Sequence, residues 1–345
     1  MPRCAPPQLQ RWAASLAEPR PEIATRSHGP AAPLRAQVRE DIWQARCSPI
    51  GLLTAAQRHL HVFEPEDYST VLNRLQRLHK AGKTSAGRLR GSSRFGALLS
   101  ALARAPLASW PLKDIALASH ALACMGIHSK EFFDGVASAA PPKLSGCKSQ
   151  DLSNIVYAFG QLRLQHDGLL NAVAVHIASG GARGLDKFTP QSISNTIYAC
   201  GQLRFRHEGM LGAVCLHLRW RLGELNGQHF SNALYGLALL EFRHAGLLDR
   251  VREFVETEES FGKFTPQAIS NTVFALVCLG GPLRSALRAL TTQLRGSGRL
   301  AAFSARDLAA LASVSAAATR GAVEGRLLTG RLRCIDVCAR ACVHV

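Results

Sequence analysis

Residues 188–199 read FTPQSISNTIYA, and residues 264–275 read FTPQAISNTVFA, so the two strings differ at only three positions. In each string a Thr stands directly before a Pro. Thr189 and Thr265 are therefore predicted to cap helices whose first residue is the following proline, because Pro tolerates the first turn and Thr accepts a backbone hydrogen bond there. Near-identity within one chain indicates an internal repeat, and the repeat decides the fold.

Four units align on an Asn, with spacings of 37 to 41 residues. In every unit a Gln lies four positions before the Asn, a Ser one before, and an aromatic residue three after. The matching residues are Gln150, Ser153, Asn154 and Tyr157; Gln191, Ser194, Asn195 and Tyr198; Gln228, Ser231, Asn232 and Tyr235; and Gln267, Ser270, Asn271 and Phe274. This recurrence predicts one structural unit used at least four times.

Each unit is predicted to form two helices joined by a short turn that contains His166, His207 or His244. Apolar residues recur at helical spacing in both halves, as in Phe230, Leu234, Leu237 and Leu240. Neither amphipathic helix can bury its apolar stripe alone, so neighbouring units must stack. The predicted fold class is therefore all-α, an α-solenoid of stacked two-helix repeats of about 37–41 residues.

The repeat divides the chain into four predicted segments. The helical repeat array covers residues 105–318, and its outer units are degenerate, as capping repeats are. Residues 51–104 form a basic helical lead-in, in which residues 68–78 are a candidate degenerate repeat. Residues 319–345 are a C-terminal cap or tail, and residues 1–50 precede the helical part.

The N-terminal segment is rich in Arg: residues 1–39 contain six Arg, no Lys, and only Glu18 and Glu22 as acids. This composition is typical of transit peptides to mitochondria or plastids. A disordered basic tail explains it equally well, because the many prolines oppose a long helix. Both interpretations of residues 1–50 stay open.

The charge balance favours a polyanionic partner. Lys and Arg number 41 against 24 acids, a net charge of +17, and neutralised phosphates release counterions. No apolar run is long enough to cross a bilayer, so we predict no membrane insertion. The ten Cys are scattered, which is typical of free thiols in a reducing compartment.

The repeated polar residues form the candidate binding surface. On a helix the Gln, the Asn and the aromatic fall within an arc of roughly 60°, opposite the apolar stripe, and stacking would align them into a ladder of amides and rings. Amides and rings suit single-stranded RNA, whose bases offer hydrogen-bonding edges and stacking faces. The RNA-binding candidates on these helices are Gln150, Asp151, Asn154, Tyr157, Gln191, Ser192, Asn195, Tyr198, Gln228, His229, Asn232, Tyr235, Gln267, Asn271 and Phe274.

A structural role competes with this interpretation, since residues shared by every unit can instead tie adjacent units through buried hydrogen bonds. The shared residues also cannot discriminate bases. The variable position three before the Asn (Asp151, Ser192, His229 and Ala268) is the better candidate for that task. At the turns, Arg163, Arg204, Arg206 and Arg243 are candidates to hold phosphates.

Motifs of catalysis are absent from the sequence: it contains no HExxH, GxSxG, GxGxxG or kinase signature. We therefore expect no enzymatic activity and no cofactor. Cys334, Cys338 and Cys342 are spaced by four residues, which favours small residues on an apolar helix face over a zinc site, because structural zinc uses tighter pairs. We predict no metal site.

The strings at 188–199 and 264–275 resemble octotricopeptide and heptatricopeptide repeats of organellar RNA-binding proteins, including the Tbc2-type chloroplast translation factors. They are also similar to the helical repeats of FAST-kinase-like proteins and of mitochondrial RNA-editing substrate-binding complex subunits. The resemblance covers about 60% of the chain. It implies binding of single-stranded organellar mRNA or rRNA, in transcript processing, stability, editing or translation, together with other ribonucleoprotein subunits.

Two departures from these families matter: no C-terminal nuclease-like RAP domain is found, and the array is short. The expected location is the mitochondrion, with the plastid as the alternative. A protein-interaction scaffold of a mitochondrial or plastid ribonucleoprotein complex, with little direct RNA contact, is the alternative function.

Overall fold

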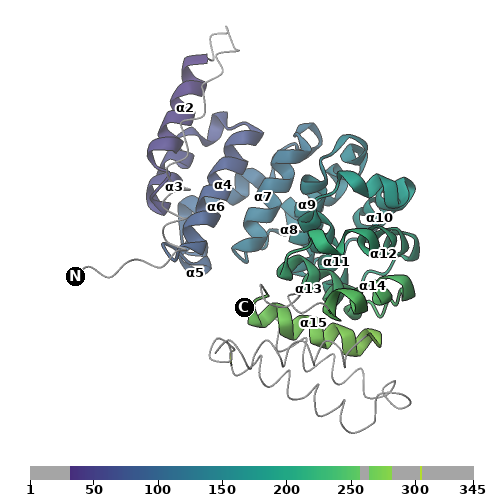
Figure 1. Cartoon of the computed structure of the whole chain (residues 1–345). Helices are drawn as coiled ribbons and strands as arrows, with labels where there is room; N and C mark the ends of the chain where they lie inside the picture. Colours follow the sequence, from purple (N-terminus) through teal and green to yellow (C-terminus); the bar gives the residue numbers. More distant parts are fainter. Residues whose placement is uncertain (1–31, 257–263, 282–303, 305–345) are drawn as a thin grey trace, which may run out of the picture.

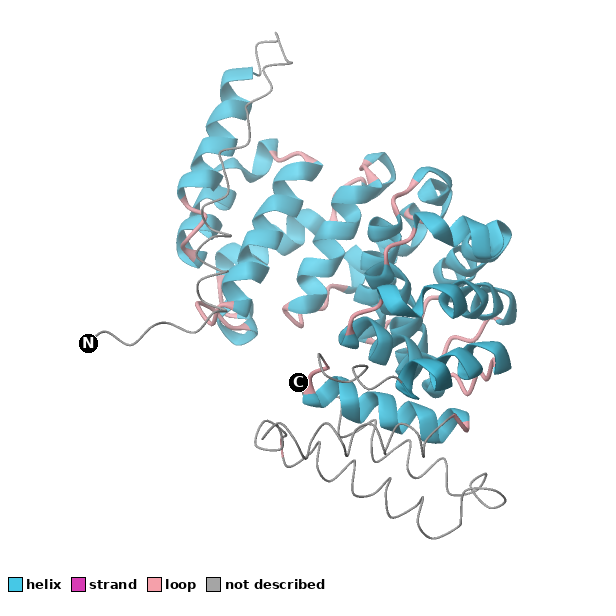
Figure 2. Cartoon of the chain, in the orientation of Figure 1, coloured by secondary structure: helices cyan, strands magenta, loops and turns pink. Residues whose placement is uncertain are grey.

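The computed structural model describes residues 32–256, 264–281 and 304 of the 345-residue chain. Helices and short turns make up these residues, and no strand occurs among them (Figure 2). The prediction of an all-α helical-repeat solenoid is confirmed.

One layer of the molecule consists of the first helix of each unit. Helices α4, α7, α9, α11, α13 and α15 pack in this order, each against the next. Their bounds are Pro65–Lys80, Leu112–Cys124, Ser149–Leu162, Pro190–Gln202, Gly227–Leu239 and Pro266–Leu279. This side-by-side order is what the stacking argument requires, since all the Asn-bearing helices are neighbours in one row.

The second helices form the other layer. They are α6 (Ser93–Ala103), α8 (Lys130–Ala139), α10 (Asp167–Gly184), α12 (Glu208–Arg221) and α14 (Ala245–Glu256), and again each packs on the next. Short 3-10 turns link the units at η2 (Leu107–Ser109), η3 (Pro141–Gly146), η4 (Leu185–Lys187) and η5 (Leu222–Glu224). In Figure 1 the row bends, with α10, α12 and α14 on its outer side and α9, α11 and α13 on its inner side.

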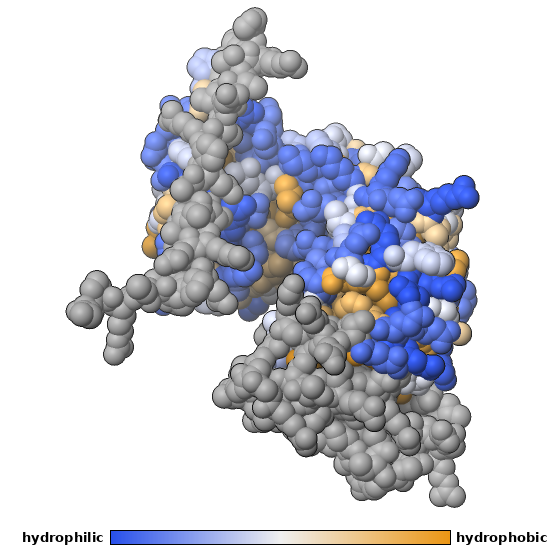
Figure 3. Space-filling view, in the orientation of Figure 1, coloured by the Kyte–Doolittle hydropathy of each residue, from blue (hydrophilic) through white to orange (hydrophobic). Residues whose placement is uncertain are grey.

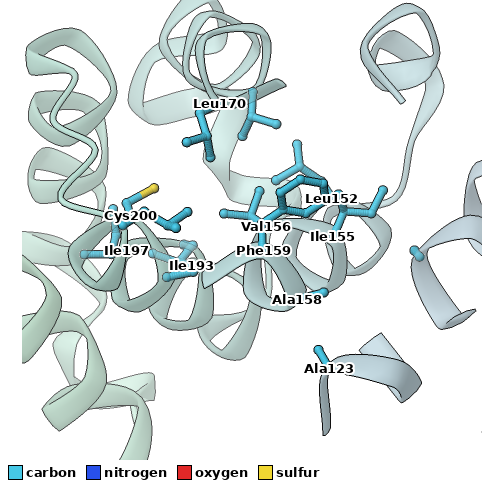
Figure 4. Close-up of a cluster of buried hydrophobic side chains, with 14 of the residues drawn as sticks. Ala123, Leu152, Ile155, Val156, Ala158, Phe159, Leu170, Ile193, Ile197 and Cys200 are labelled. Atoms are coloured by element: carbon cyan, nitrogen blue, oxygen red, sulfur yellow. The ribbon is translucent and has the colours of Figure 1, made fainter. Parts of the chain in front are cut away.

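The core lies between the two layers and is aliphatic. Figure 4 shows Leu152, Val156 and Phe159 of α9 beside Ile193 and Ile197 of α11, with Leu170 of α10 above them. All six side chains are buried. The predicted apolar stripes therefore meet across the layers, as an amphipathic helix pair requires.

Turn chemistry matches the sequence prediction. Thr189 accepts a hydrogen bond from the Ser192 amide, and Thr265 from the Ala268 amide, each at a helix whose first residue is proline. The turn histidines cap the second helices, since Nδ1 of His166, His207 and His244 accepts a backbone hydrogen bond in each unit. These side chains fix where each helix begins.

The array begins earlier than residue 105. Helix α4 packs on α7 in the first-helix row, and its Ser69 donates to the Glu66 carbonyl at 3.1 Å, as the repeated Ser does in later units. The region before it is also helical: α2 (Ala32–Gln44), α3 (Pro49–His59), η1 (Leu60–Val62) and, after α4, the short α5 (Ala86–Arg90).

Helix α2 changes the boundary predicted for the N-terminal segment. Arg35 pairs with Asp67 of α4 at 2.6 Å and with Glu64 at 3.0 Å, so residues 32–50 belong to the packed structure and not to a tail. The prediction of a transit peptide or tail now concerns residues 1–31, which lie outside the described residues. The predicted C-terminal part of the array, 282–318, and the segment 319–345 also lie outside them, apart from Ser304.

Candidate nucleic-acid interface

The first-helix row has one face that does not pack on the second helices, and we call it the amide face. It is made by the positions four before, at, three after and seven after the repeated Asn. In α9 to α15 these are Gln150, Asn154, Tyr157 and Gln161; Gln191, Asn195, Tyr198 and Gln202; Gln228, Asn232, Tyr235 and Leu239; and Gln267, Asn271, Phe274 and Cys278. The side of the molecule seen in Figure 3 is mostly hydrophilic, with hydrophobic residues exposed near its centre.

The side-chain amides of the repeated Gln and Asn are accessible to solvent and form no hydrogen bonds within the described ranges. Each of the four Gln is exposed and each of the four Asn is half-buried. Within the described ranges, none of these eight side chains forms a hydrogen bond, although neighbouring polar groups do. The expected alternative, in which the Asn ties adjacent units by buried hydrogen bonds, therefore does not describe Asn154, Asn195, Asn232 or Asn271.

The repeated Ser has a different role from the Asn. Ser153, Ser194 and Ser231 are buried, and each donates to the carbonyl three residues earlier at 3.1 Å. The bond lies within one helix, so it ties no units together, but it satisfies a hydroxyl in a tightly packed place. The Ser is structural and the Asn is not hydrogen-bonded.

Aromatic rings form two groups on the amide face, His120 with Tyr157 on α7 and α9, and Tyr198 with Tyr235 and Phe274 on α11 to α15. Ring centroids are 5.6 Å apart for His120 and Tyr157, 6.0 Å for Tyr198 and Tyr235, and 5.4 Å for Tyr235 and Phe274. The rings lie against each other, so Tyr235 and Phe274 are only 4% and 6% exposed. This row offers edges and hydroxyl groups to a ligand more than open stacking faces.

The tyrosine hydroxyl is a hydrogen-bonding group on this face. Gln161 Nε2 donates to Tyr157 Oη at 2.5 Å. Burial raises the pKa of the Tyr157 phenol, which keeps the hydroxyl protonated and able to donate to a base edge or a sugar. In the next unit Gln202 Oε1 is a buried acceptor with no hydrogen-bond partner in the described structure, so an unsatisfied polar atom lies beside the ring row.

The variable position does not form an exposed row. Ala268 is buried, and Ser192 is buried with its hydroxyl 2.9 Å from Thr189 Oγ1. Asp151 is half-buried, and desolvation raises the pKa of its carboxyl. Only Asp151 and His229 reach the surface, so Ser192 is corrected from a base-reading candidate to a helix-start residue, and the position cannot discriminate bases in every unit.

Two of the four turn arginines, Arg204 and Arg206, bind the neighbouring unit. Arg204 donates to the Leu239 carbonyl at 2.7 Å, and Arg206 to the Leu240 carbonyl at 3.0 Å, while Arg206 also pairs with Glu208. Both thereby cap the end of α13, where carbonyls lack helical partners. A methyl group on Gly280 would lie 2.8 Å from Arg243 Nη2, so the Arg243 guanidinium lies against the end of α15.

All four turn arginines are exposed, and Arg243 lies against the end of α15 without a hydrogen bond or ion pair among the described residues. Arg163 likewise has no hydrogen-bond or ion-pair partner among them. Of the four predicted phosphate contacts, it is the one whose guanidinium is not already engaged by, or lying against, the next repeat. The amide face is accordingly poor in charge, despite the net charge of the chain.

Two features of the repeat were missed by the sequence reasoning. The position six after the Asn is small in α9 and α11, and a methyl group on Gly201 would lie 2.9 Å from Gly236 Cα of the next helix. The position nine after the Asn has positive φ in every unit, at Arg163, Arg204, Glu241 and Gly280. Both recur at the repeat spacing, which was the signal that could have revealed them.

Metal-ligand clusters and membrane-spanning helices do not occur among the described residues. No group of three or more His, Cys, Asp or Glu side chains that could hold a metal ion occurs in the described ranges, and Cys334, Cys338 and Cys342 lie outside them. No helix within the described part has the length and apolarity needed to cross a membrane.

Residues 94–245 match the family model of the RNA-editing substrate-binding complex 6 protein. The match runs from α6 to the start of α14 and includes the amide face of α9, α11 and α13. No curated protein matches the chain. The chain is thus similar over this region to a helical protein of an RNA-editing complex, while the octotricopeptide type of its repeats stays a prediction.

Proposed function

We propose that this protein is a non-enzymatic RNA-binding subunit of an organellar RNA-processing complex, and that its amide face binds single-stranded RNA. The observation that carries the proposal is the row of four repeated Asn amides, half-buried, aligned on neighbouring helices and without hydrogen-bond partners. A partly buried amide without a hydrogen-bond partner has an uncompensated desolvation cost, and a ligand that bonds to the amide can offset this cost. Base edges offer the matching donors and acceptors.

The similarity to the RNA-editing substrate-binding complex 6 protein supports a role in RNA processing within a complex. RNA-editing complexes of this family are generally found in mitochondria. A mitochondrial location agrees with the Arg-rich composition of residues 1–39. We therefore propose the mitochondrion as the location. We further propose that the bound RNA is a mitochondrial transcript. The protein would then serve the processing, stability, editing or translation of that transcript.

The face predicts a particular mode of binding. It carries amides and phenols but few cations, and Arg204 and Arg206 already bond to carbonyls. The face should contact mainly bases and sugars, while phosphates meet cations elsewhere, such as the exposed Arg163. Contacts that position RNA and contacts that read it would then reside on different parts of the molecule.

The experiment measures binding of a fluorescent mixed-sequence RNA oligonucleotide to the full chain by anisotropy. The test variant replaces Asn195 and Asn232 by Ala, and the matched control replaces Asn171, an exposed Asn on the outer helix α10. We expect the double variant to bind roughly tenfold or more weakly, at about 1 kcal/mol per lost hydrogen bond, and the control to bind like wild type.

Thermal unfolding of the same proteins separates the two roles of the Asn. Since the amides have no partner in the described structure, the double variant should unfold at the wild-type temperature. A large loss of stability with unchanged RNA affinity per folded molecule would instead show a structural Asn. Absence of RNA binding by wild type even at low salt would favour the alternative, a protein-interaction scaffold.

A further inference from the structure

The outer surface of the second-helix layer has an apolar area on α12. Trp220 is 74% exposed and Leu216, one helical turn before it, is 45% exposed. Positions four apart lie on one face of a helix, so both side chains point to the same side. Large apolar side chains that are exposed together mark interaction sites more often than solvated surface.

Comparison among the repeats shows that this apolar surface is not required by the fold. Val175 of α10 occupies the same repeat position as Leu216 and is 58% exposed, whereas Glu253 occupies it in α14. The three helices pack in the same layer, so the solenoid accepts a charged residue there. The aliphatic side chains of α10 and α12 are therefore a local property of these two units.

A cation lies at the edge of the apolar area. The Arg219 guanidinium is 5.0 Å from the centroid of the Trp220 ring, and it also lies beside the start of α14, where a methyl group on Gly246 would be 3.3 Å from Nη1. Arg219 has no carboxylate partner in the described structure, and its Nε is buried and unbonded. A carboxylate brought by a partner would pair with the uncompensated charge of the Arg219 guanidinium.

We propose that Leu216, Trp220 and Arg219 form a docking surface for an amphipathic helix of another protein subunit, which places aliphatic side chains on Leu216 and Trp220 and a carboxylate on Arg219. Trp and Arg are the side chains that most often dominate such interfaces. A second copy of this chain would bring another uncompensated Arg and is disfavoured by charge. RNA would use the Trp220 ring but would gain nothing from the aliphatic Leu216.

This inference goes beyond RNA binding and does not depend on it, because the amide face is on the other layer. The two surfaces would allow the protein to hold RNA on its inner side and a protein subunit on its outer side at the same time.

The test uses a labelled synthetic helical peptide with Leu at helical spacing and Glu on both flanks, and a matched peptide in which Lys replaces Glu. Anisotropy measures binding of each peptide to the full chain. We expect the Glu peptide to bind saturably, and the Lys peptide and the variant Leu216→Ser/Trp220→Ser to show affinity at least roughly tenfold lower. The control Glu253→Ser, at the equivalent position on α14, should bind like wild type.

Equal binding of both peptides, or of the Glu peptide to wild type and the double Ser variant, overturns the proposal. So does a loss of RNA affinity in the double variant, which would assign Trp220 to base stacking. A wild-type dimer in sedimentation that the double variant abolishes would assign the surface to a second copy. Because both side chains are exposed, the double variant should fold, and its unfolding temperature verifies this. Failure here leaves RNA binding by Asn195 and Asn232 unaffected.

Discussion

At the scale of single residues, the left-handed position at the end of each first helix shows how this repeat tolerates strain. Arg163, Arg204 and Glu241 have φ between 51° and 55°, where only Gly is unstrained. The amide after each of them bonds to the carbonyl five residues earlier, as in Leu164 to Phe159 at 2.9 Å. This bond satisfies a terminal carbonyl and holds the strained conformation.

Arg163→Gly should stabilise the protein by about 1 kcal/mol, because it removes left-handed strain from a side chain without a partner. The free energy of unfolding in urea measures the effect. Gly126 and Gly280 already have positive φ, so Gly126→Ala is the matched control and should destabilise by a similar amount. A destabilising Arg163→Gly would mean that the guanidinium makes a contact that outweighs the strain.

Three histidines predict how stability depends on pH. Desolvation by burial lowers the pKa of His120, and it is also the main reason why the pKa values of His217 and His229 are lowered. The folded chain then binds protons more weakly than the unfolded chain, whose His titrates near 6.5. The free energy of unfolding should therefore fall as the pH drops through 6.5, and be insensitive to these groups at higher pH.

His120→Tyr tests this most simply, since Tyr or Phe occupies its position in four later units and the ring contact with Tyr157 can persist. The stability lost between about pH 7.5 and about pH 5.5 should be smaller in the variant than in wild type. The exposed His61→Gln is the control. An unchanged pH dependence in His120→Tyr would exclude His120 as a contributor.

At the scale of the helices, close approach within the first-helix row depends on small residues. Gly160 faces Ala199, Gly201 faces Gly236, and Gly236 also faces the Ile197 carbonyl. Ala123 and Ala158, drawn in Figure 4, stand at the equivalent small positions of α7 and α9. The small side chains let these helices lie side by side, and this alignment brings the Asn and the rings into rows.

Gly201→Ala should destabilise the protein by about 1 to 3 kcal/mol, the usual cost of overpacking, although Ala favours helices. The added methyl would lie 2.9 Å from backbone atoms of Gly236, which cannot rotate away. Gly212 on α12 has open space around it, so Gly212→Ala should stabilise by about 1 kcal/mol. Opposite signs in urea unfolding support the packing account, and equal signs contradict it.

At the scale of the whole molecule, the sequence predicted the stacking because each helix carried an apolar stripe that needed a neighbour. It also predicted the caps at Thr189 and Thr265, since capping is local chemistry. The alignment on Asn could not reveal which polar residues were bonded. The burial of Ser192, and the capture of Arg204 by a carbonyl 35 residues away, depend on how neighbouring units approach.

The start of the packed structure was also outside what patterns could show. Helix α2 joins the fold through the Arg35–Asp67 ion pair and through the core residues Val38 and Ile42, and two apolar positions are too few for hydrophobic periodicity to predict a packed helix. The same limit applies to the outer layer. Leu216 and Trp220 face solvent, as does Glu253 at the position equivalent to Leu216, and the stacking pattern does not constrain exposed positions. Tertiary contacts decided these points, and the repeat pattern decided the rest.

The central claim is that RNA lies on the amide face, and ultraviolet crosslinking of the full chain to single-stranded RNA, followed by mass spectrometry of the crosslinked peptides, tests it most directly. We predict crosslinks within 149–162, 190–202 and 227–239, at or beside Tyr157, Tyr198 and the repeated Asn. Crosslinks confined to the outer helices α10, α12 and α14 would contradict the account, whatever the affinity of the complex.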